Sequence, residues 1–220
     1  LYEKLSERIP PSLSCEWDND GIMCSADTST EVNNVLITLD VTEEVVDYAI
    51  SRNFDLIISH HPLIFKPISH VCEDTHVSRK IIKLITNNVS VFSFHTRADR
   101  VEGGVNDTLA RLLCIENTES FIPYGRVGEV ENQSFTQFAT KVAEALELDI
   151  NSIPMVKATD TVSRVAVVSG SGKADIKEAV DCGADTFVTG EVMHNHMIDC
   201  KELGLNLICA THYATERIIW

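Results

Sequence analysis

The stretch VLITLDVTEEVVDYAISRNFDLIISHH, residues 35–61, decides the fold because a second stretch repeats its pattern 130 residues later. Residues 165–191 read VAVVSGSGKADIKEAVDCGADTFVTGE and align with the first stretch without a gap. Each stretch begins with a short β-branched strand, continues through a polar turn into an amphipathic helix, and ends in a second apolar strand. Strands that alternate with helices in this way are typical of parallel pairing. The sequence therefore predicts an α/β fold with an internal duplication.

Each of the two stretches is followed by one more helix and one more strand, VSVFSF in the first case and LNLICA in the second. We therefore expect a first α/β repeat over residues 1–114 and a second over residues 134–220, packed against the first. The polar residues 115–133 are interpreted as a linker between them. Ser134 and Gln137 have the spacing of a capping box, which predicts that a helix begins there.

The composition excludes several classes of protein. Of the 220 residues, 44% are hydrophobic and 23% are charged, as in an ordinary globular chain, and no apolar run has the length of a membrane-spanning helix. Lys and Arg together number 18 against 33 acidic residues, which gives a net charge of −15. A surface this negative repels the phosphates of nucleic acids. We expect neither nucleic acid nor a membrane as a partner, and an anionic small molecule would need a locally positive site.

The seven cysteines are odd in number and widely spaced, and they include no C-x-x-C pair. This usage favours a reducing cytoplasm over a disulfide framework. The opening LYEKLSERIP also lacks the basic and then apolar order of a secretory signal. The motif HVCEDTH at 70–76 is interpreted as a polar loop that enters a helix rather than as a metal site. We therefore expect a cytoplasmic protein.

Three polar motifs end predicted strands: SHHP at 59–62, HTRAD at 95–99 and THYATE at 211–216. In open α/β sheets, ligands collect outside the carboxyl ends of the strands. Pro62 cannot continue a central strand, so the chain leaves the sheet directly after His61. At such a turn, two adjacent histidines can both face one cleft. These motifs are therefore the candidates for a functional site.

The residue types in these motifs predict a dinuclear metal centre. His212 and Glu216 are four residues apart and share one face if their segment is helical. A carboxylate can bridge two cations, and a set of imidazoles and carboxylates suits borderline divalent ions. Two such ions with Asp99 and Glu216 leave a centre of about +2, which lowers the pKa of bound water toward about 7 and attracts anions.

These stretches resemble the GTP cyclohydrolase I type 2 homologue family, also described as NGG-interacting-factor-3-like. The matching stretches cover nearly the whole chain: EWDNDGIMC (16–24), ITLDVTEEVVDYAI (37–50), DLIISHHPLIFKPI (55–68), HTRADRVEGGVNDTLA (95–110), GSGKADIKEAVDCGADTFVTGE (170–191) and LGLNLICATHYATE (203–216). The resemblance implies a cytoplasmic protein with two intertwined α/β repeats and mixed sheets, assembled as a toroidal homohexamer. It also implies two divalent metal ions per chain. Sites of histidine and carboxylate ligands accept zinc, iron or manganese, so the identity of the metal stays open. By position, His60 and His212 would bind one ion, His61 and Asp99 the other, and Glu216 both.

Several residues need separate interpretation beside this resemblance. His95 matches the family motif but lies outside the ligand set, so we expect it to act as a catalytic proton carrier or to support a ligand. Arg97 stands where the family has an amide, and it either forms a local ion pair or favours a more anionic substrate. Asn195 separates His194 from His196, where many relatives have adjacent histidines, and we assign no metal to either.

Two further motifs have both a structural and a functional interpretation. The turn EWDNDG at 16–21 contains Asp18 and Asn19, either of which could cap the backbone or line the cleft. The run GSGK at 170–173 lacks the spacing of an ATP-binding P-loop. A Gly-rich turn before a helix can still hold one phosphate through its backbone N–H groups.

Two functions from different classes follow from these motifs. The first is a metal-dependent hydrolase, in which metal-bound hydroxide attacks a nucleotide or a phosphoester-like substrate. The alternative is a non-enzymatic metal-binding, partner-binding or regulatory protein whose ions are cargo or structural. An open coordination position favours the enzyme, and a closed ligand shell favours the alternative. The family name implies GTP ring opening, but nothing in the sequence recognises guanine in particular.

Overall fold

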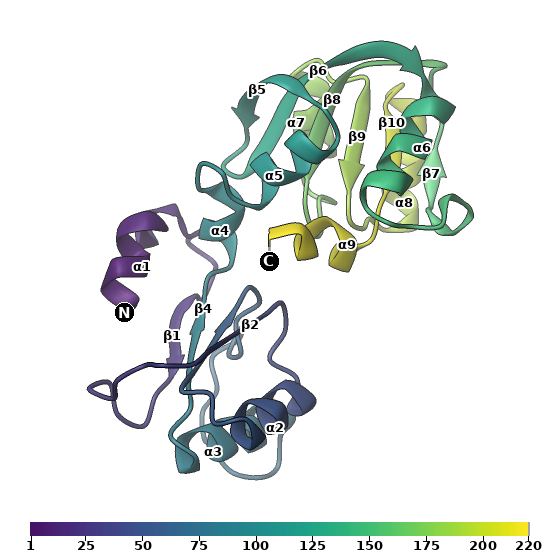
Figure 1. Ribbon diagram of the computed structural model, residues 1–220. Coiled ribbons are helices and arrows are strands. Elements are labelled where there is room, and N and C mark those ends of the chain that lie inside the picture. The colour runs from purple at the N-terminus through teal and green to yellow at the C-terminus, as the bar shows by residue number, and fades with distance from the viewer. Residues whose placement is uncertain (220) are drawn as a thin grey trace. The chain divides into compact units, whose positions relative to one another are not determined.

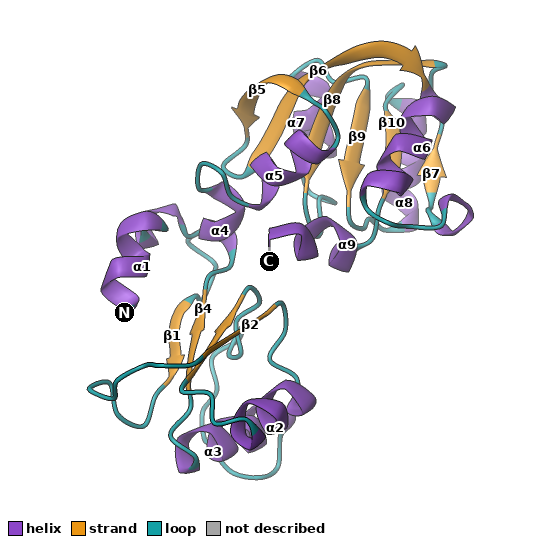
Figure 2. Ribbon diagram, viewed as in Figure 1, coloured by secondary structure: helices purple, strands orange, loops and turns teal. Residues whose placement is uncertain are grey.

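The computed structural model describes residues 1–219, which form two compact units (Figure 1). The first unit comprises residues 1–98 and the second residues 99–219. Helix α4 (Thr96–Arg100) carries the chain from one unit to the other. Each unit has its own sheet (Figure 2). No helix within the described residues is long and apolar enough to cross a membrane.

These boundaries differ from those that the sequence suggests, residues 1–114, 115–133 and 134–220. The segment 115–133, interpreted as a linker, forms strand β5 (Glu116–Phe121) and most of strand β6 (Gly125–Ser134). The two strands pair as an antiparallel hairpin at one edge of the second sheet. Strand β5 exposes all its residues except Phe121, because an edge strand faces solvent. Its polar composition therefore looks like that of a linker.

The first unit is a four-stranded sheet with the strand order β1-β4-β3-β2. Strands β2, β3 and β4 are parallel, and β1 runs antiparallel to β4. Helices α2 and α3 begin where the hydroxyls of Thr42 and Thr75 accept backbone N–H groups. The elements are α1 (Tyr2–Arg8), the 3-10 turn Pro11–Leu13, β1 (Gly21–Cys24), β2 (Val35–Thr38), α2 (Glu43–Ser51), β3 (Leu56–Ser59), α3 (His76–Thr86) and β4 (Ser90–Ser93).

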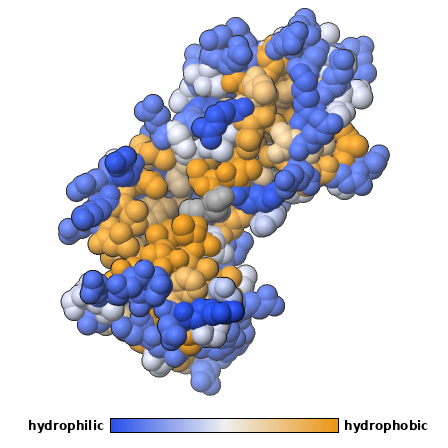
Figure 3. Space-filling model, viewed as in Figure 1, coloured by the Kyte–Doolittle hydropathy of each residue, from blue (hydrophilic) through white to orange (hydrophobic). Residues whose placement is uncertain are grey.

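Helices α2 and α3 cover one face of this sheet, as Figure 1 shows. Leu36, Ile57 and Val91 point from the strands into the core beneath these helices. On strand β2 the neighbouring residues Val35 and Ile37 point the other way and are exposed. Apolar side chains accordingly gather over the strands of this unit in Figure 3. The first sheet is therefore buried mainly on one face.

The second unit is a six-stranded mixed sheet with the order β5-β6-β8-β9-β10-β7. Strands β8, β9 and β10 are parallel, and the outer strands are antiparallel to their neighbours. The capping box predicted at Ser134 and Gln137 is present and begins α6. The remaining elements are α5 (Val105–Leu112), α6 (Phe135–Ala145), the 3-10 turn Ile150–Ser152, β7 (Met155–Val156), β8 (Thr161–Val168), α7 (Ile176–Asp181), β9 (Thr186–Thr189), α8 (His194–Glu202), β10 (Asn206–Cys209), α9 (His212–Glu216) and the 3-10 turn Arg217–Ile219.

Helices cover both faces of the second sheet. Val165 and Val167 of strand β8 pack into a core with α5 and α6. Ala166 and Val168 of the same strand pack into a separate core with α7 and α8. Strands buried on both faces are apolar throughout, which explains the continuous apolar runs of this part of the sequence. The predicted α/β fold with mixed sheets is therefore confirmed.

The parallel strands of the two sheets share a register at the offset of 130 residues. The paired residues of β2 and β3 match those of β8 and β9 at this offset. Asp55 and Asp185 also correspond, and each carboxylate accepts two backbone N–H groups at 2.8 or 2.9 Å. The donors are Asn33 and Asn34 in the first unit and Ser163 and Arg164 in the second. The common register agrees with an internal duplication, which itself stays a prediction.

Candidate metal centre

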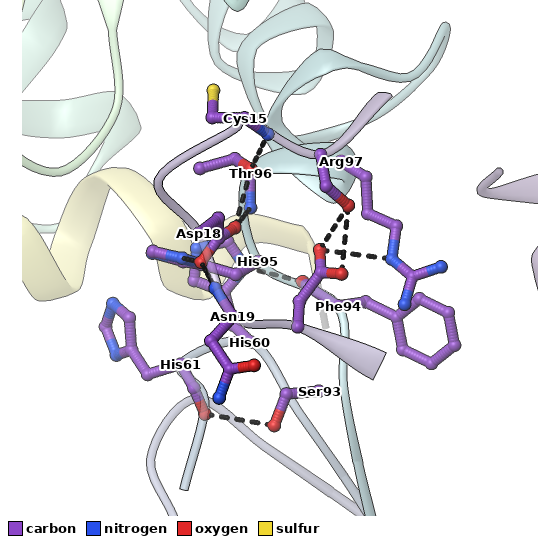
Figure 4. A network of polar contacts seen from close by, with 12 residues as sticks. Cys15, Asp18, Asn19, His60, His61, Ser93, Phe94, His95, Thr96 and Arg97 are labelled. Carbon is purple, nitrogen blue, oxygen red and sulfur yellow. Dashed lines mark hydrogen bonds and ion pairs between the residues drawn. The ribbon is translucent and has the colours of Figure 1, made fainter. Parts of the chain in front are cut away.

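Three histidines gather at the carboxyl ends of strands β3 and β4 in the first unit (Figure 4). His60 and His61 follow β3 directly, and His95 lies shortly after β4. The centroids of their rings are 5.0 to 5.6 Å apart. One nitrogen of each ring lies within 4.8 Å of those of the other two. Three imidazoles at this spacing could hold a divalent ion.

In each of these histidines the Nδ1 atom faces an oxygen. A backbone carbonyl or an ionised carboxylate can only accept a hydrogen bond, so Nδ1 carries the proton and Nε2 keeps its lone pair. The acceptors are the carbonyl of Phe94 for His60 at 3.2 Å, Asp40 Oδ1 for His61 at 2.9 Å and Asp18 Oδ1 for His95 at 2.8 Å. Such a partner behind each ring is the usual arrangement for metal-binding histidines.

Asp18, in the turn before β1, holds His95 and the start of α4. Its carboxylate is completely buried, and its Oδ2 atom accepts hydrogen bonds from the backbone N–H and the hydroxyl of Thr96 at 3.1 and 2.6 Å. Burial alone would raise the pKa of Asp18, but the hydrogen bonds from His95 and Thr96 outweigh it and lower the pKa from 3.8 to about 2. Asp18 is therefore ionised at neutral pH and orients the His95 ring. The sequence left capping and lining the cleft as alternatives for this residue.

Arg97, which departs from the family pattern, is completely buried in the first unit. Its guanidinium donates to Asp20 Oδ2 at 3.1 Å, to the carbonyl of Ile9 at 3.2 Å and to the Tyr2 hydroxyl at 3.1 Å. It also lies 4.5 Å above the centre of the Phe94 ring. Of the two interpretations of Arg97, the structure shows the local ion pair.

The second unit carries two candidate ligands on helix α9. The helix extends from His212 to Glu216. Thr211 caps its amino terminus, where the Thr211 hydroxyl accepts the N–H of Ala214 at 3.2 Å. His212 Nε2 lies 3.1 Å from Glu216 Oε1, as the four-residue spacing predicts for one helix face. His212 Nδ1 lies 3.1 Å from Glu191 Oε1, so this ring also has a carboxylate behind it.

Two glycines make room for this helix, and sequence reasoning missed both. A Cβ atom on Gly170, whose φ is +64°, would lie 2.4 Å from Glu216 Oε1 and 3.1 Å from His212 Nε2. A Cβ atom on Gly190 would lie 2.3 Å from the carbonyl oxygen of Gly170 and 2.8 Å from the Cα of His212. The ends of β8 and β9 therefore accept no side chain beneath α9. The sequence hints at this role only by comparison of the two stretches, because the residues 130 positions earlier, Asp40 and His60, are not glycines.

Asp99, the fifth predicted ligand, lies at the start of the second unit. The hydroxyl of Ser169, directly after β8, donates to Asp99 Oδ1 at 3.3 Å. The buried side chain of Asn106 donates to the Asp99 carbonyl at 3.4 Å and accepts the Ser169 N–H at 2.8 Å. These contacts hold Asp99 at the carboxyl end of β8, the end of the second sheet that also carries Gly170.

The predicted ligands thus fall into two groups, one in each unit. His60 and His61 lie at the strand ends of the first unit, beside His95. The second group, in the other unit, consists of Asp99, His212 and Glu216. The structure describes each group by itself. The assignment of particular ligands to two shared ions remains a prediction.

The GSGK run at 170–173 uses backbone N–H groups for hydrogen bonds within the protein. In the GSGK run, the N–H of Gly170 donates to the Thr215 hydroxyl at 3.0 Å and the N–H of Gly172 to the Thr189 hydroxyl at 2.9 Å. Helix α7 begins only at Ile176, so these N–H groups do not form its amino terminus. This use of the turn leaves the phosphate interpretation without support.

The loop before α3 leads into a helix, as the sequence predicts. His70, Cys72 and Asp74 could offer three ligand atoms within 4.8 Å of one another, but all three are exposed. His70 Nε2 lies 2.9 Å from Asp74 Oδ2, and α3 begins at His76. The loop is therefore polar and enters a helix, and the absence of a metal from it stays an expectation.

Comparisons with known proteins give the family. The whole chain, residues 1–220, matches the family model described as Duf34/NIF3 (NGG1p interacting factor 3), so the chain belongs to this family. It is 34% identical to a GTP cyclohydrolase 1 type 2 homolog of Clostridium acetobutylicum, over 98% of this chain and 84% of the relative.

Solved structures give the same family. A Bacillus cereus protein related to NIF3 is 25% identical, with a TM-score of 0.90 over 99% of this chain and 88% of its own. A hypothetical protein of Staphylococcus aureus is 29% identical, with a TM-score of 0.88 over 97% of this chain and 85% of its own. The resemblance that the sequence suggests is confirmed by these comparisons.

Proposed function

We propose that this protein is a dinuclear divalent-metal hydrolase that acts on a nucleotide or a phosphoester-like substrate. One observation carries the proposal: three histidines at strand ends hold Nδ1 against an oxygen that can only accept a hydrogen bond, and so keep Nε2 as an electron-pair donor. They are His60, His61 and His95. The name of the Clostridium acetobutylicum relative, a GTP cyclohydrolase 1 type 2 homolog, supports a nucleotide as the first substrate class to test.

The residues that we propose as ligands are those that the family resemblance implies. His60 and His212 would hold one ion, and His61 and Asp99 the other, with Glu216 as the bridge. Imidazole and carboxylate donors suit zinc, iron or manganese, and availability decides among these metals. Divalent ions at such a centre supply Lewis acidity, which lowers the pKa of a coordinated water toward about 7.

His95 is the residue to which we assign proton transfer. Its Nε2 atom can accept a proton, because its Nδ1 proton is already held by Asp18 at 2.8 Å. The charge of Asp18 stabilises the imidazolium that forms, and the low pKa of Asp18, about 2, keeps the proton on the imidazole. This pair would therefore return the proton to a leaving group after it has removed one from the nucleophile.

A second candidate function is a non-enzymatic protein that binds metal and a protein partner. The observation in its favour is the outer face of the first sheet, where Ile22, Val35 and Ile37 are exposed. Exposed apolar patches often mark contact surfaces.

The same face supports a further proposal, that the protein self-associates in the cytoplasm as the homohexamer that the resemblance implies. Light scattering that gives only the 24.4 kDa of one chain would contradict it.

A substrate screen separates the two functions. Protein loaded with zinc, iron or manganese is tested against nucleotides and phosphoesters, with Glu216→Ala as the matched control. The hydrolase proposal predicts turnover of at least one substrate and its loss in the control, because the bridging carboxylate serves both ions. Metal-loaded protein that turns over none of these substrates would favour the non-enzymatic function.

A further inference from the structure

A groove in the first unit opens beside His61. Its volume is about 650 Å³, which is in the range of small-molecule sites. Its floor is largely apolar and comes from the segment after β3 and from the start of α3. The apolar residues that line it include Leu63, Ile64, Pro67 and Val77. Any ligand in this groove would lie against His61, one of the proposed metal ligands.

Phe65, one of the groove residues, contacts a second exposed aromatic ring, Trp17, and both contact the His95 ring. Phe65, which lines the groove, is 47% exposed, and Trp17 is 61% exposed. The ring centroids of Phe65 and Trp17 are 6.0 and 6.1 Å from that of His95, and 6.2 Å from each other. The two rings meet edge to face, at 78°. The open face of Phe65 is therefore a surface on which a planar ring can stack, with Trp17 beside it.

The groove also contains two lysines, although the chain carries −15 overall. Lys66 and Lys80 line it, against one carboxylate, Asp40, whose Oδ1 atom already lies 2.9 Å from His61 Nδ1. Lys80 Nζ donates to the carbonyl of Val41 at 2.6 Å, which uses one of the three donors of an ammonium group. Glu43 also acts on Lys80 from outside the lining. Among the residues that line the groove, two ammonium groups stand against one carboxylate, so the lysines can pair with an anionic ligand.

We propose that this groove binds the substrate as a planar aromatic ring that carries an anionic group. The ring stacks on the exposed face of Phe65 with Trp17 beside it, and a phosphate or carboxylate group pairs with Lys66 and Lys80. A purine nucleoside monophosphate has both parts. This inference rests on the proposed function, and it narrows the substrate class from nucleotides and phosphoesters to anions that bear an aromatic ring.

The fluorescence of Trp17 tests the proposal directly. The chain has two tryptophans, so a Trp220→Phe background leaves Trp17 as the only indole. GMP, guanosine and inorganic phosphate are titrated into this protein with and without EDTA. We expect saturable quenching by GMP, weaker binding of guanosine, and no quenching by phosphate alone. Because stacking on one aromatic ring contributes about 1–3 kcal/mol, Phe65→Leu should weaken GMP binding about tenfold.

Matched variants control for general effects on the unit. Tyr48→Leu removes a ring of similar exposure, 49%, from α2, and Lys83→Met removes a charge from α3 that pairs with Asp47. Neither should change GMP affinity, whereas Lys66→Met should lower it severalfold. Absence of saturable quenching, or equal effects of Phe65→Leu and Tyr48→Leu, would overturn the inference.

The inference and the proposed hydrolase can fail separately. GMP binding that depends on Phe65 but accompanies no hydrolysis of any substrate would contradict the proposed hydrolase and support the proposed binding groove. Hydrolysis that needs Glu216 but shows the same KM in Lys66→Met and wild type would support the proposed hydrolase. It would contradict the proposal that its substrate binds in this groove.

Discussion

The parallel strands of the two units share a register, but the residues at the ends of these strands differ between the units. At the ends of the first two parallel strands, the first unit has side chains that can bind or orient a metal ligand. The second unit has two glycines there, and helix α9 lies over them with its own histidine and glutamate. The corresponding pairs, at the offset of 130, are Asp40 and Gly170, His60 and Gly190, and His61 and Glu191. One frame can therefore present ligands from its strand ends or from a helix laid across them.

Strands β4 and β10, the third parallel strand of each sheet, show that two similar motifs occupy different positions. Ser93 and Cys209 pair with corresponding residues of β3 and β9, so His95 corresponds to Thr211 rather than to His212. His95 therefore precedes α4, whereas His212 is the first residue of α9. The motifs HTRAD and HYATE look equivalent in the sequence but are shifted by one residue on the frame. This shift is consistent with different roles for His95 and His212.

The largest effect should separate these two histidines. If His95 transfers protons and binds no ion, His95→Ala should keep its metal and lose about 10²–10⁴-fold in rate on any substrate found. His212→Ala should lose metal as well as rate. Metal content and rate are measured on the same samples. Loss of metal in His95→Ala would place this ring among the ligands and contradict the assignment.

The second residues of α4 and α9 provide the next comparison. Arg97 is completely buried beside Asp20, and Tyr213, at the corresponding position, is 64% exposed. Arg97→Leu leaves the Asp20 carboxylate buried without its cation, so we expect a loss of about 3–5 kcal/mol in the free energy of unfolding. Tyr213→Leu should change it by less than about 0.5 kcal/mol. Urea unfolding measures both, and similar losses would show that Arg97 does not support the fold as described.

The glycines of the second unit predict a smaller but clear effect. A Cβ on Gly190 meets only backbone atoms, which cannot move aside, so Gly190→Ala should cost about 3 kcal/mol of stability. Gly204, with φ of +74°, has no atom within 4 Å of the same added carbon, and Gly204→Ala should cost only about 1 kcal/mol. Thermal unfolding compares the two variants. Equal costs would mean that α9 does not need the space above Gly190.

A buried carboxylate in each unit gives the last comparison. Unlike Asp18, Asp175 is buried with little compensation: the Tyr124 hydroxyl donates to it at 3.3 Å, but burial still raises its pKa from 3.8 to about 6. Folding therefore favours the protonated form, so Asp175 destabilises the protein above pH 6, and this penalty disappears as the pH falls toward 4. Asp175→Asn should raise the free energy of unfolding by about 2–3 kcal/mol at pH 7.

Urea unfolding at several pH values between 4 and 7 checks this prediction. The advantage of Asp175→Asn should shrink steadily below pH 6. A stabilisation that does not depend on pH would come from some other cause. Asp18→Asn should instead destabilise the protein at pH 7, because the pKa of Asp18 is lowered by folding.

Much of the fold could be predicted because local patterns carry it. The alternation of strands and helices, the end of β3 before His60 and the cap at Ser134 all depend on residues close together in the chain. The hairpin of β5 and β6 could not be predicted in the same way. Its exposed edge strand has no apolar alternation, and its pairing with β8 depends on contacts with residues distant in sequence.

The support of the candidate site was harder to predict than its ligands. The histidines and acids of the strand ends are visible as motifs. Asp18, however, lies 77 residues before His95, and a polar turn in the sequence does not show which distant ring it will meet. Gly170 and Gly190 are visible only as glycines, because their role depends on the helix that approaches them.

The metal content of the purified protein tests the central claim most directly. Protein is loaded with zinc, iron or manganese in separate samples, desalted, and subjected to elemental analysis beside Glu216→Ala and Glu191→Ala. The account predicts two ions per chain in the wild type, nearly none in Glu216→Ala, and weaker binding of at least one ion in Glu191→Ala, since this residue only supports His212. Wild-type protein that retains no ion of any of the three metals, or Glu216→Ala protein that retains both, would contradict it.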